Sequence, residues 1–118
     1  MPVSLNEEAF RQAKALIKSG DVVRDERDDW SEHSPSAKKE NAYIDAHGID
    51  DFGRWHLGVD PSANEGTKQR FSFPFGDLKK VHRCAVISLE SRAAQYHHAG
   101  IARAAKELLE AIDATKAS

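Results

Sequence analysis

The last third of the chain constrains the fold more than any other segment, because its apolar residues recur at helical spacing in two blocks. One face of the first block carries Leu78, Val81, Ala85 and Leu89, and one face of the second carries Ile101, Ala104, Ala105, Leu108 and Ile112. The run His97-His98-Ala99-Gly100 separates the blocks. Two helices joined by so short a connection pack antiparallel. Residues 77–114 are therefore predicted to form a helical hairpin, which Asp77 caps at its start.

A further helix is predicted over residues 4–20. Ser4 and Glu7 have the S-x-x-E spacing of a capping box, in which the two side chains bond to free N–H groups of the first turn. Apolar residues follow at helical spacing as far as Ile17, and Gly20 is placed to end the helix. The apolar stripe of this helix is expected to pack on the C-terminal hairpin.

Residues 21–34 show neither the helical nor the strand period and are rich in acids, so they are predicted to form an acidic loop. At most, Val22 and Val23 form a short extended piece. Trp30 is expected to pin this loop to the body of the protein, since a large aromatic side chain in a polar segment usually finds an apolar surface.

The pair Ser34-Pro35 has the order typical of an N-cap and a first helical residue. It predicts a surface helix that runs to His47, with Gly48 as its stop. Beyond this helix, two segments alternate with the period of a half-buried strand, one on Trp55, Leu57 and Val59 and the other on Phe71, Phe73 and Phe75. These two segments are long enough to pair as a small two-stranded hairpin.

The predicted fold is thus mainly α, or α+β if that small hairpin forms, with the C-terminal antiparallel helix pair packed against the N-terminal helix. A length of 118 residues is expected to form a single domain over residues 1–118. The one cysteine, Cys84, excludes an internal disulfide and favours a reducing compartment. The N-terminus has no apolar core of a signal peptide, and no apolar run approaches the roughly 20 residues of a membrane span. A cytoplasmic protein without a membrane partner is expected.

Charge is segregated along the chain, although the net charge is only −2. Residues 21–65 hold twelve acidic and five basic side chains, whereas residues 68–106 hold eight Lys or Arg and two acids. Either the halves neutralise each other, within one chain or between two subunits, or the basic half binds phosphate, nucleic acid or a protein partner. The residues expected to form this basic helical face are Lys79, Lys80, His82, Arg83, Arg92 and Gln95.

Six histidines are many for this length, but no two of them have the i, i+4 spacing that places two metal ligands on one helical face. His82 and Cys84 are two residues apart, so on a helix they diverge. A metal site or a small active site would have to be assembled from distant segments, for instance from His56, His82 and Cys84. The alternative is that Cys84, beside Ala85, is a small buried hydrophobic residue. The sequence carries no nucleotide-binding loop, nucleophile elbow or EF-hand pattern, and no cofactor is expected.

Several strings in this chain resemble a group of short, uncharacterised bacterial proteins of about the same length. The strings are Trp30-Ser31-Glu32-His33, His47-Gly48, Arg54-Trp55-His56-Leu57-Gly58-Val59-Asp60, Phe73-Pro74-Phe75-Gly76-Asp77-Leu78-Lys79-Lys80-Val81-His82-Arg83 and Glu90-Ser91-Arg92-Ala93-Ala94-Gln95. The resemblance covers residues 5–113 and implies a stand-alone cytoplasmic bacterial protein, but no activity, cofactor or site.

The leading functional hypothesis is a small non-enzymatic binding or interaction protein that uses its basic helical face for an anionic ligand or a partner, and that is able to self-associate. The first alternative is a small metal-binding protein or enzyme built on His56, His82 and Cys84. The second is the subunit of a structural oligomer.

Overall fold

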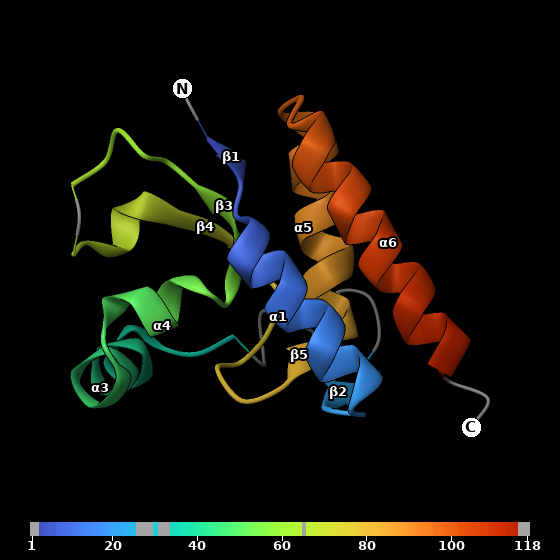
Figure 1. Cartoon of the computed structure of the whole chain (residues 1–118), viewed down its shortest axis with the longest axis horizontal. Coiled ribbons are helices and arrows are strands. Elements are labelled where there is room, and N and C mark those ends of the chain that lie inside the picture. Colours follow the sequence, from blue (N-terminus) through green and yellow to red (C-terminus); the bar gives the residue numbers. More distant parts are fainter. Residues whose placement is uncertain (1–2, 26–29, 31–33, 65, 116–118) are drawn as a thin grey trace.

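The computed structural model describes residues 3–25, 30, 34–64 and 66–115 (Figure 1). Its helices are α1 (Glu7–Lys18), α3 (Ala37–His47), α4 (Ile49–Gly53), α5 (Arg83–Gln95) and α6 (Ala99–Thr115), with a 3-10 turn at Lys68–Arg70. Its strands are β1 (Ser4–Leu5), β2 (Val22–Val23), β3 (His56–Val59), β4 (Phe71–Pro74) and β5 (Val81–His82). The prediction of a mainly helical fold with a small sheet is confirmed.

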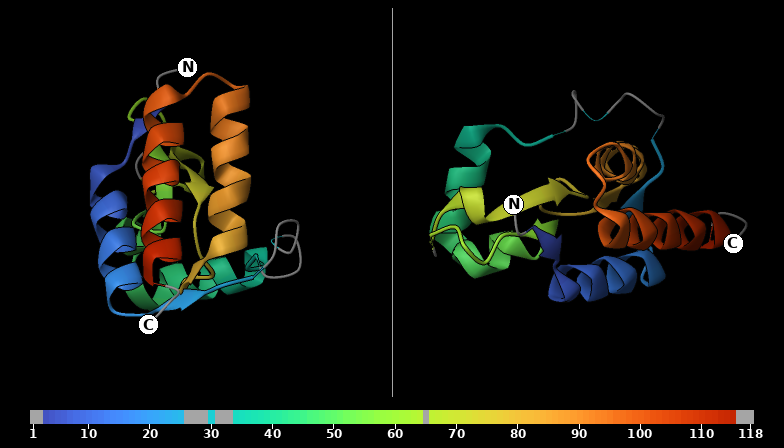
Figure 2. Two further views of the ribbon diagram at one scale, coloured as in Figure 1. Left: turned by 90° about the vertical axis from the view of Figure 1, so that its right-hand side faces the viewer. Right: turned by 90° about the horizontal axis from the view of Figure 1, so that it is seen from above.

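The C-terminal helices α5 and α6 form the predicted antiparallel pair, and α6 lies between α5 and α1 (Figure 2). The core between these three helices is apolar and includes Ala9, Ala13, Ile17, Val86, Leu89, Ala105, Leu108 and Ile112, each at most 2% exposed. Alanines at the contact allow the helices to approach closely, and Leu and Ile fill the remaining volume. The stripes predicted for the N-terminal and C-terminal helices therefore form the core.

The start of the hairpin differs from the prediction. Asp77 does not cap a helix: its Oδ1 accepts hydrogen bonds from the backbone N–H groups of Lys79, at 3.0 Å, and Lys80, at 2.8 Å. This Asx-type turn is followed by β5, so that α5 begins only at Arg83. An aspartate competes well for neighbouring N–H groups in turns as well as at helix starts, and here the turn is formed.

At the N-terminus the predicted capping box is wrong. Asn6 caps α1 by accepting a hydrogen bond from the backbone N–H of Ala9, while Ser4 and Leu5 form β1. The extended segment has a partner: Ser4 pairs with Val59 and Leu5 with Gly58. Strand pairing thus outweighs one more helical turn. Gly20, with a φ of 87°, ends the helix region as predicted.

Strands β3 and β4 form the predicted hairpin, and β1 joins it as a third antiparallel strand on the far side of β3. Gly58 faces Ser72 across the hairpin, where a Cβ atom would lie 2.7 Å from the ring of Phe73. A second, parallel pair joins β2 to β5, with Val22 opposite Val81. This pair brings the segment after β2 to the start of α5.

The helix predicted from Ser34 to His47 exists but begins later. Ser36 is its N-cap, accepting from the backbone N–H of Lys39 at 3.2 Å, and Gly48 ends it with a φ of 91°. The following short helix α4 was not predicted. Trp55 ties this part of the chain to the sheet, because its indole N–H donates to the Tyr43 hydroxyl at 3.1 Å.

Only part of the predicted acidic loop 21–34 is described. Positions 26–29 and 31–33 lie outside the described residues, whereas β2, Asp25 and Trp30 lie within them. Trp30 is half-buried, and its ring centroid lies 5.7 Å from that of His82, as expected for a side chain that pins the loop. Within the described residues, the helices are too short or too polar to cross a membrane.

Candidate functional site

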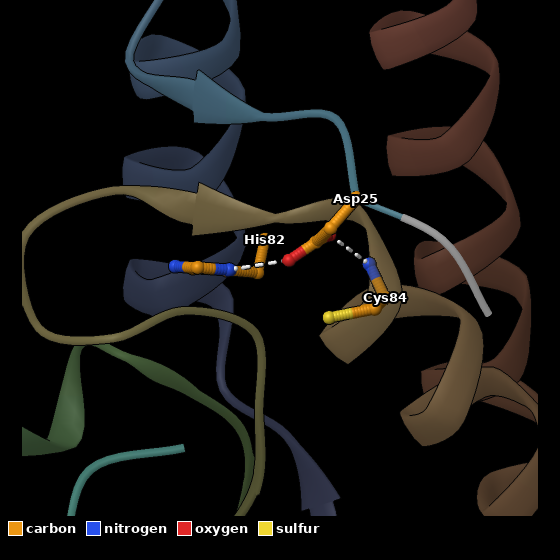
Figure 3. Close-up of side chains that lie close together, drawn as sticks. All are labelled: Asp25, His82 and Cys84. Carbon is orange, nitrogen blue, oxygen red and sulfur yellow. Dashed lines mark hydrogen bonds and ion pairs between the residues drawn. The ribbon is translucent and has the colours of Figure 1, made fainter. Parts of the chain in front are cut away.

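Polar groups converge where β5 passes into α5. His82 is the N-cap of α5 but makes no side-chain capping bond of its own. Instead, Asp25, two residues after β2, reaches the helix start: its Oδ1 accepts from the backbone N–H of Cys84 at 2.8 Å, and its Oδ2 lies 2.7 Å from Nδ1 of His82 (Figure 3). A carboxylate that is distant in the sequence therefore caps α5, and its negative charge interacts favourably with the positive end of the helix dipole.

The second nitrogen of His82 also meets a carboxylate. Nε2 lies 2.8 Å from Oδ2 of Asp77, the residue whose Oδ1 holds the turn before β5. Burial acts to lower the pKa of His82, whose side chain is 4% exposed, but hydrogen bonds to Asp25 and Asp77 and their negative charges outweigh it and raise this pKa. The ring is thus held as an imidazolium between two carboxylates.

The pKa values of both carboxyl groups are lowered. Burial acts to raise the pKa of Asp25, but the hydrogen bonds that it accepts from the thiol and backbone N–H of Cys84 and from His82 prevail. Burial likewise opposes the shift at Asp77, and its hydrogen bonds from His82 and from the N–H groups of Lys80 and Lys79 prevail. These shifts favour a positive ring between two negative carboxylates, which agrees with a ring nitrogen of His82 lying on each of them.

Asp25, His82 and Cys84 each offer a donor atom, and these atoms lie within 4.8 Å of one another. Cys84 is 1% exposed and is not part of a disulfide. Oxygen, nitrogen and sulfur donors together suit borderline ions such as Zn²⁺. Figure 3 shows the sulfur of Cys84 directed to the same side of the helix start as the His82 ring.

His56, the third member of the trio predicted from sequence, lies elsewhere. It is buried between the rings of Phe52 and Phe71, and its Nδ1–H donates to the carbonyl of Phe52 at 3.0 Å. Burial lowers the pKa of His56 to about 4, so the ring is neutral. The structure therefore brings two of the three predicted residues together and supplies Asp25 in the place of the third.

The predicted basic face is divided. Arg83 pairs with Asp113 of α6, its Nε at 3.0 Å from Oδ1, and His82 is buried between its two aspartates. Lys79 and Lys80 are exposed in the turn before β5, whereas Arg92 and Gln95 are exposed near the other end of α5. Since a helix of 13 residues is roughly 20 Å long, these two groups form separate patches.

Two hollows flank the His82 cluster. The larger, about 440 Å³, is lined by Pro35, Lys39, Ala42, Tyr43, Asp77, Leu78 and Lys79. The smaller, about 270 Å³, is lined by Trp30, Ser72, Phe73, Pro74, Ala85, Ser88, Leu89 and Arg92. Each hollow therefore shares one wall residue with the surroundings of His82: Asp77 in the larger and Trp30 in the smaller.

The part that sequence reasoning missed is Asp25. Aspartates are common in polar loops, and nothing in the local pattern separates Asp25 from its acidic neighbours. The signal that could have found it is the pair of adjacent valines at 22–23. When this short strand aligns with Val81, Asp25 lies beside His82 and Cys84. Comparison with protein families, with curated proteins and with solved structures found no match. The resemblance to short bacterial proteins stays a prediction, and functional argument depends on the geometry alone.

Proposed function

We propose that this protein is a small, non-enzymatic binding protein of the cytoplasm, and that its ligand is a small anion with a flat apolar body. The observation that carries the proposal is the position of Arg92. It is exposed at the rim of the smaller hollow, and no carboxylate partner for it is found in the part of the chain that the structure describes. Guanidinium groups in such positions bind carboxylate and phosphate groups well.

The other residues of this hollow suit the rest of such a ligand. Trp30 and Phe73 provide aromatic surface, Ala85 and Leu89 form an apolar floor, and the Ser88 hydroxyl is able to donate or accept a hydrogen bond. A volume of about 270 Å³ is close to the lower end of the range for ligand pockets. An aromatic carboxylate or an aromatic phosphate monoester fits this combination.

Binding is favoured over catalysis at the neighbouring cluster because both nitrogens of His82 are engaged by carboxylates. A general base for the Cys84 thiol would need a free ring nitrogen that faces the sulfur. The buried Cys84, which is in no disulfide, supports the cytoplasm as the compartment, since thiols stay reduced there. The alternative is that a second copy of the chain, or another protein, binds to the same face.

The test uses the fluorescence of Trp30. The chain has two tryptophans, and Trp55 is 5% exposed in the core, so a ligand in the hollow changes chiefly the emission of Trp30. We expect phenyl phosphate and benzoate to change this emission with saturation, and neutral benzyl alcohol to bind far more weakly. Arg92→Gln should weaken binding roughly 10- to 100-fold. The matched control, Arg11→Gln, alters another exposed helical arginine and should leave binding unchanged.

Equal binding of the anions and the neutral alcohol, or equal loss in both arginine variants, would overturn the proposal. A short nucleic-acid duplex and light scattering are run in parallel at two salt concentrations. If the duplex binds in a salt-dependent way and phenyl phosphate gives no response, the proposal is wrong and the ligand is a nucleic acid. If the protein is a dimer whose interface covers Trp30, the proposal is wrong and the hollow binds a second copy of the chain.

A further inference from the structure

We propose that Asp25, His82 and Cys84 form a binding site for a divalent transition-metal ion of the zinc class, with Asp77 as the residue that orients His82. This site is distinct from the anion hollow and does not depend on it. The ligand atoms would be a carboxylate oxygen of Asp25, Nδ1 of His82 and the sulfur of Cys84.

The backbone at His82 is what makes this convergence possible. Two residues that are two apart on a helix point to different faces, but His82 is not helical: its φ of −108° and ψ of 124° are those of an extended residue. Helix α5 begins only at Arg83, so the chain bends between His82 and Cys84. Both side chains then lie beside Asp25, whose position is set by the pairing of β2 with β5 (Figure 3).

The distances are close to those of a metal site. A zinc ion about 2.0–2.3 Å from its ligands holds those atoms roughly 3–4 Å apart. All three donor atoms lie within 4.8 Å of one another, and Oδ2 of Asp25 lies 2.7 Å from Nδ1 of His82. A small outward rotation of the Asp25 carboxylate therefore opens enough room, while its Oδ1 keeps the hydrogen bond from the Cys84 N–H.

Asp77 supplies the partner that a metal-binding histidine needs. Its Oδ2 lies 2.8 Å from Nε2 of His82 and so accepts a hydrogen bond from the N–H group of that nitrogen. This fixes the ring orientation and leaves Nδ1, on the side of Asp25 and Cys84, to donate its lone pair to the ion. The other carboxylate oxygen of Asp77, Oδ1, is held in place by hydrogen bonds from the backbone N–H groups of Lys79 and Lys80.

Charge is conserved when the ion enters. In the metal-free cluster each ring nitrogen of His82 donates to one carboxylate, at 2.7 Å to Asp25 and 2.8 Å to Asp77, so a positive ring and two negative carboxylates sum to one negative charge beside a neutral Cys84 thiol. A divalent ion displaces the proton on Nδ1 and the thiol proton, both of which pass to solvent. The neutral imidazole, the thiolate, two carboxylates and the ion again sum to one negative charge. A buried site therefore exchanges two protons for one ion without an added burden of unpaired charge.

The experiment is a titration of the untagged, chelator-treated full-length protein with Co²⁺ and Zn²⁺, followed by equilibrium dialysis and absorption spectroscopy. We expect one equivalent of Co²⁺ to bind with a thiolate-to-cobalt charge-transfer band, and Zn²⁺ to displace it. Cys84→Ser should abolish the charge-transfer band, and Asp77→Asn should weaken binding about 10- to 100-fold. Circular dichroism of each variant establishes that it is folded.

Two matched controls sharpen the result. His56→Gln removes a histidine that is buried, like His82, but lies outside the cluster, and His97→Gln removes an exposed one. Both should bind Co²⁺ like the wild type. Asp25 also caps α5, so a substitution of Asp25 would not separate the loss of a ligand from a change at the helix start. The presence or absence of the charge-transfer band in Cys84→Ser therefore decides the matter. No uptake by the wild type, a band that persists in Cys84→Ser, or loss of binding in His56→Gln would overturn the proposal.

Discussion

Asp25 and Cys84 are 59 positions apart in the sequence, and the carboxylate of the first accepts a hydrogen bond from the backbone N–H of the second at 2.8 Å. The same carboxylate pairs with His82, so a single side chain both caps α5 and neutralises a buried imidazolium. Asp25 thus adds a side-chain link between the acidic segment and the basic half of the chain to the backbone pairing of β2 with β5.

Removal of this carboxylate should destabilise the fold strongly. We expect Asp25→Ala to lower the free energy of unfolding by about 3–5 kcal/mol, because it leaves the buried His82 with only the partly exposed Asp77 as a counter-charge and removes the acceptor of the Cys84 N–H group. Asp25→Asn should cost less, since its amide oxygen still accepts from Cys84. Urea denaturation in the presence of a chelator measures both, and equal losses would show that the capping bond contributes nothing.

The buried His56 should make the protein sensitive to mild acid. Its pKa is about 4 in the folded state against an ordinary 6.5, so the unfolded chain takes up a proton between these two values and the folded chain does not. The contribution of the neutral His56 to the free energy of unfolding is therefore fully present above pH 6.5. It decreases by roughly 3 kcal/mol as the pH falls towards 4. His56→Gln should flatten this part of the curve of unfolding free energy against pH.

The pH dependence of His82 should have the opposite sign. Its folded pKa is raised above the ordinary 6.5, because of Asp25 and Asp77, so its stabilising charge is fully present below 6.5 and is lost as the pH rises through the folded value. In metal-free protein, we expect the contribution of His82 to the free energy of unfolding to fall as the pH rises above 6.5. His82→Gln should remove that slope, and an unchanged slope would show that the imidazolium is not the source.

Two glycines should respond to alanine with opposite signs. At Gly58 a Cβ atom would lie 2.5 Å from the Ser72 hydroxyl and 2.7 Å from the Phe73 ring, so Gly58→Ala should cost about 1–3 kcal/mol through strain in the hairpin. At Gly100, in the first turn of α6, nothing lies within 4 Å, and Gly100→Ala should stabilise the helix by about 0.5–1 kcal/mol. Chemical denaturation of the pair checks this, and a loss in Gly100→Ala would contradict it.

Periodic segments could be predicted from the sequence, and segments held by distant partners could not. The stripes of α1, α5 and α6 are visible because buried residues on a helix recur every three to four positions. Ser4 and Asp77 misled the prediction, because each has the right chemistry to start a helix but is used elsewhere: Ser4 in a strand that depends on Val59, and Asp77 in a turn that also binds His82.

The candidate site shows the same division. His82 and Cys84 could be singled out by residue type, but their convergence could not, since it requires the extended backbone of His82 and the pairing of β2 with β5. Asp25 enters the site only through that pairing. His56 was a plausible third partner by type alone, and its neutral, aromatic surroundings become visible only once β3 is placed.

The N-terminal residues supply one strand to each sheet: β1 borders β3, and β2 borders β5. During synthesis this segment is made well before its partners Val59 and Val81. Neither sheet can close on the nascent chain until those residues emerge. Assembly is therefore expected to be late and concerted, with slow closure of long chain loops as its kinetic barrier.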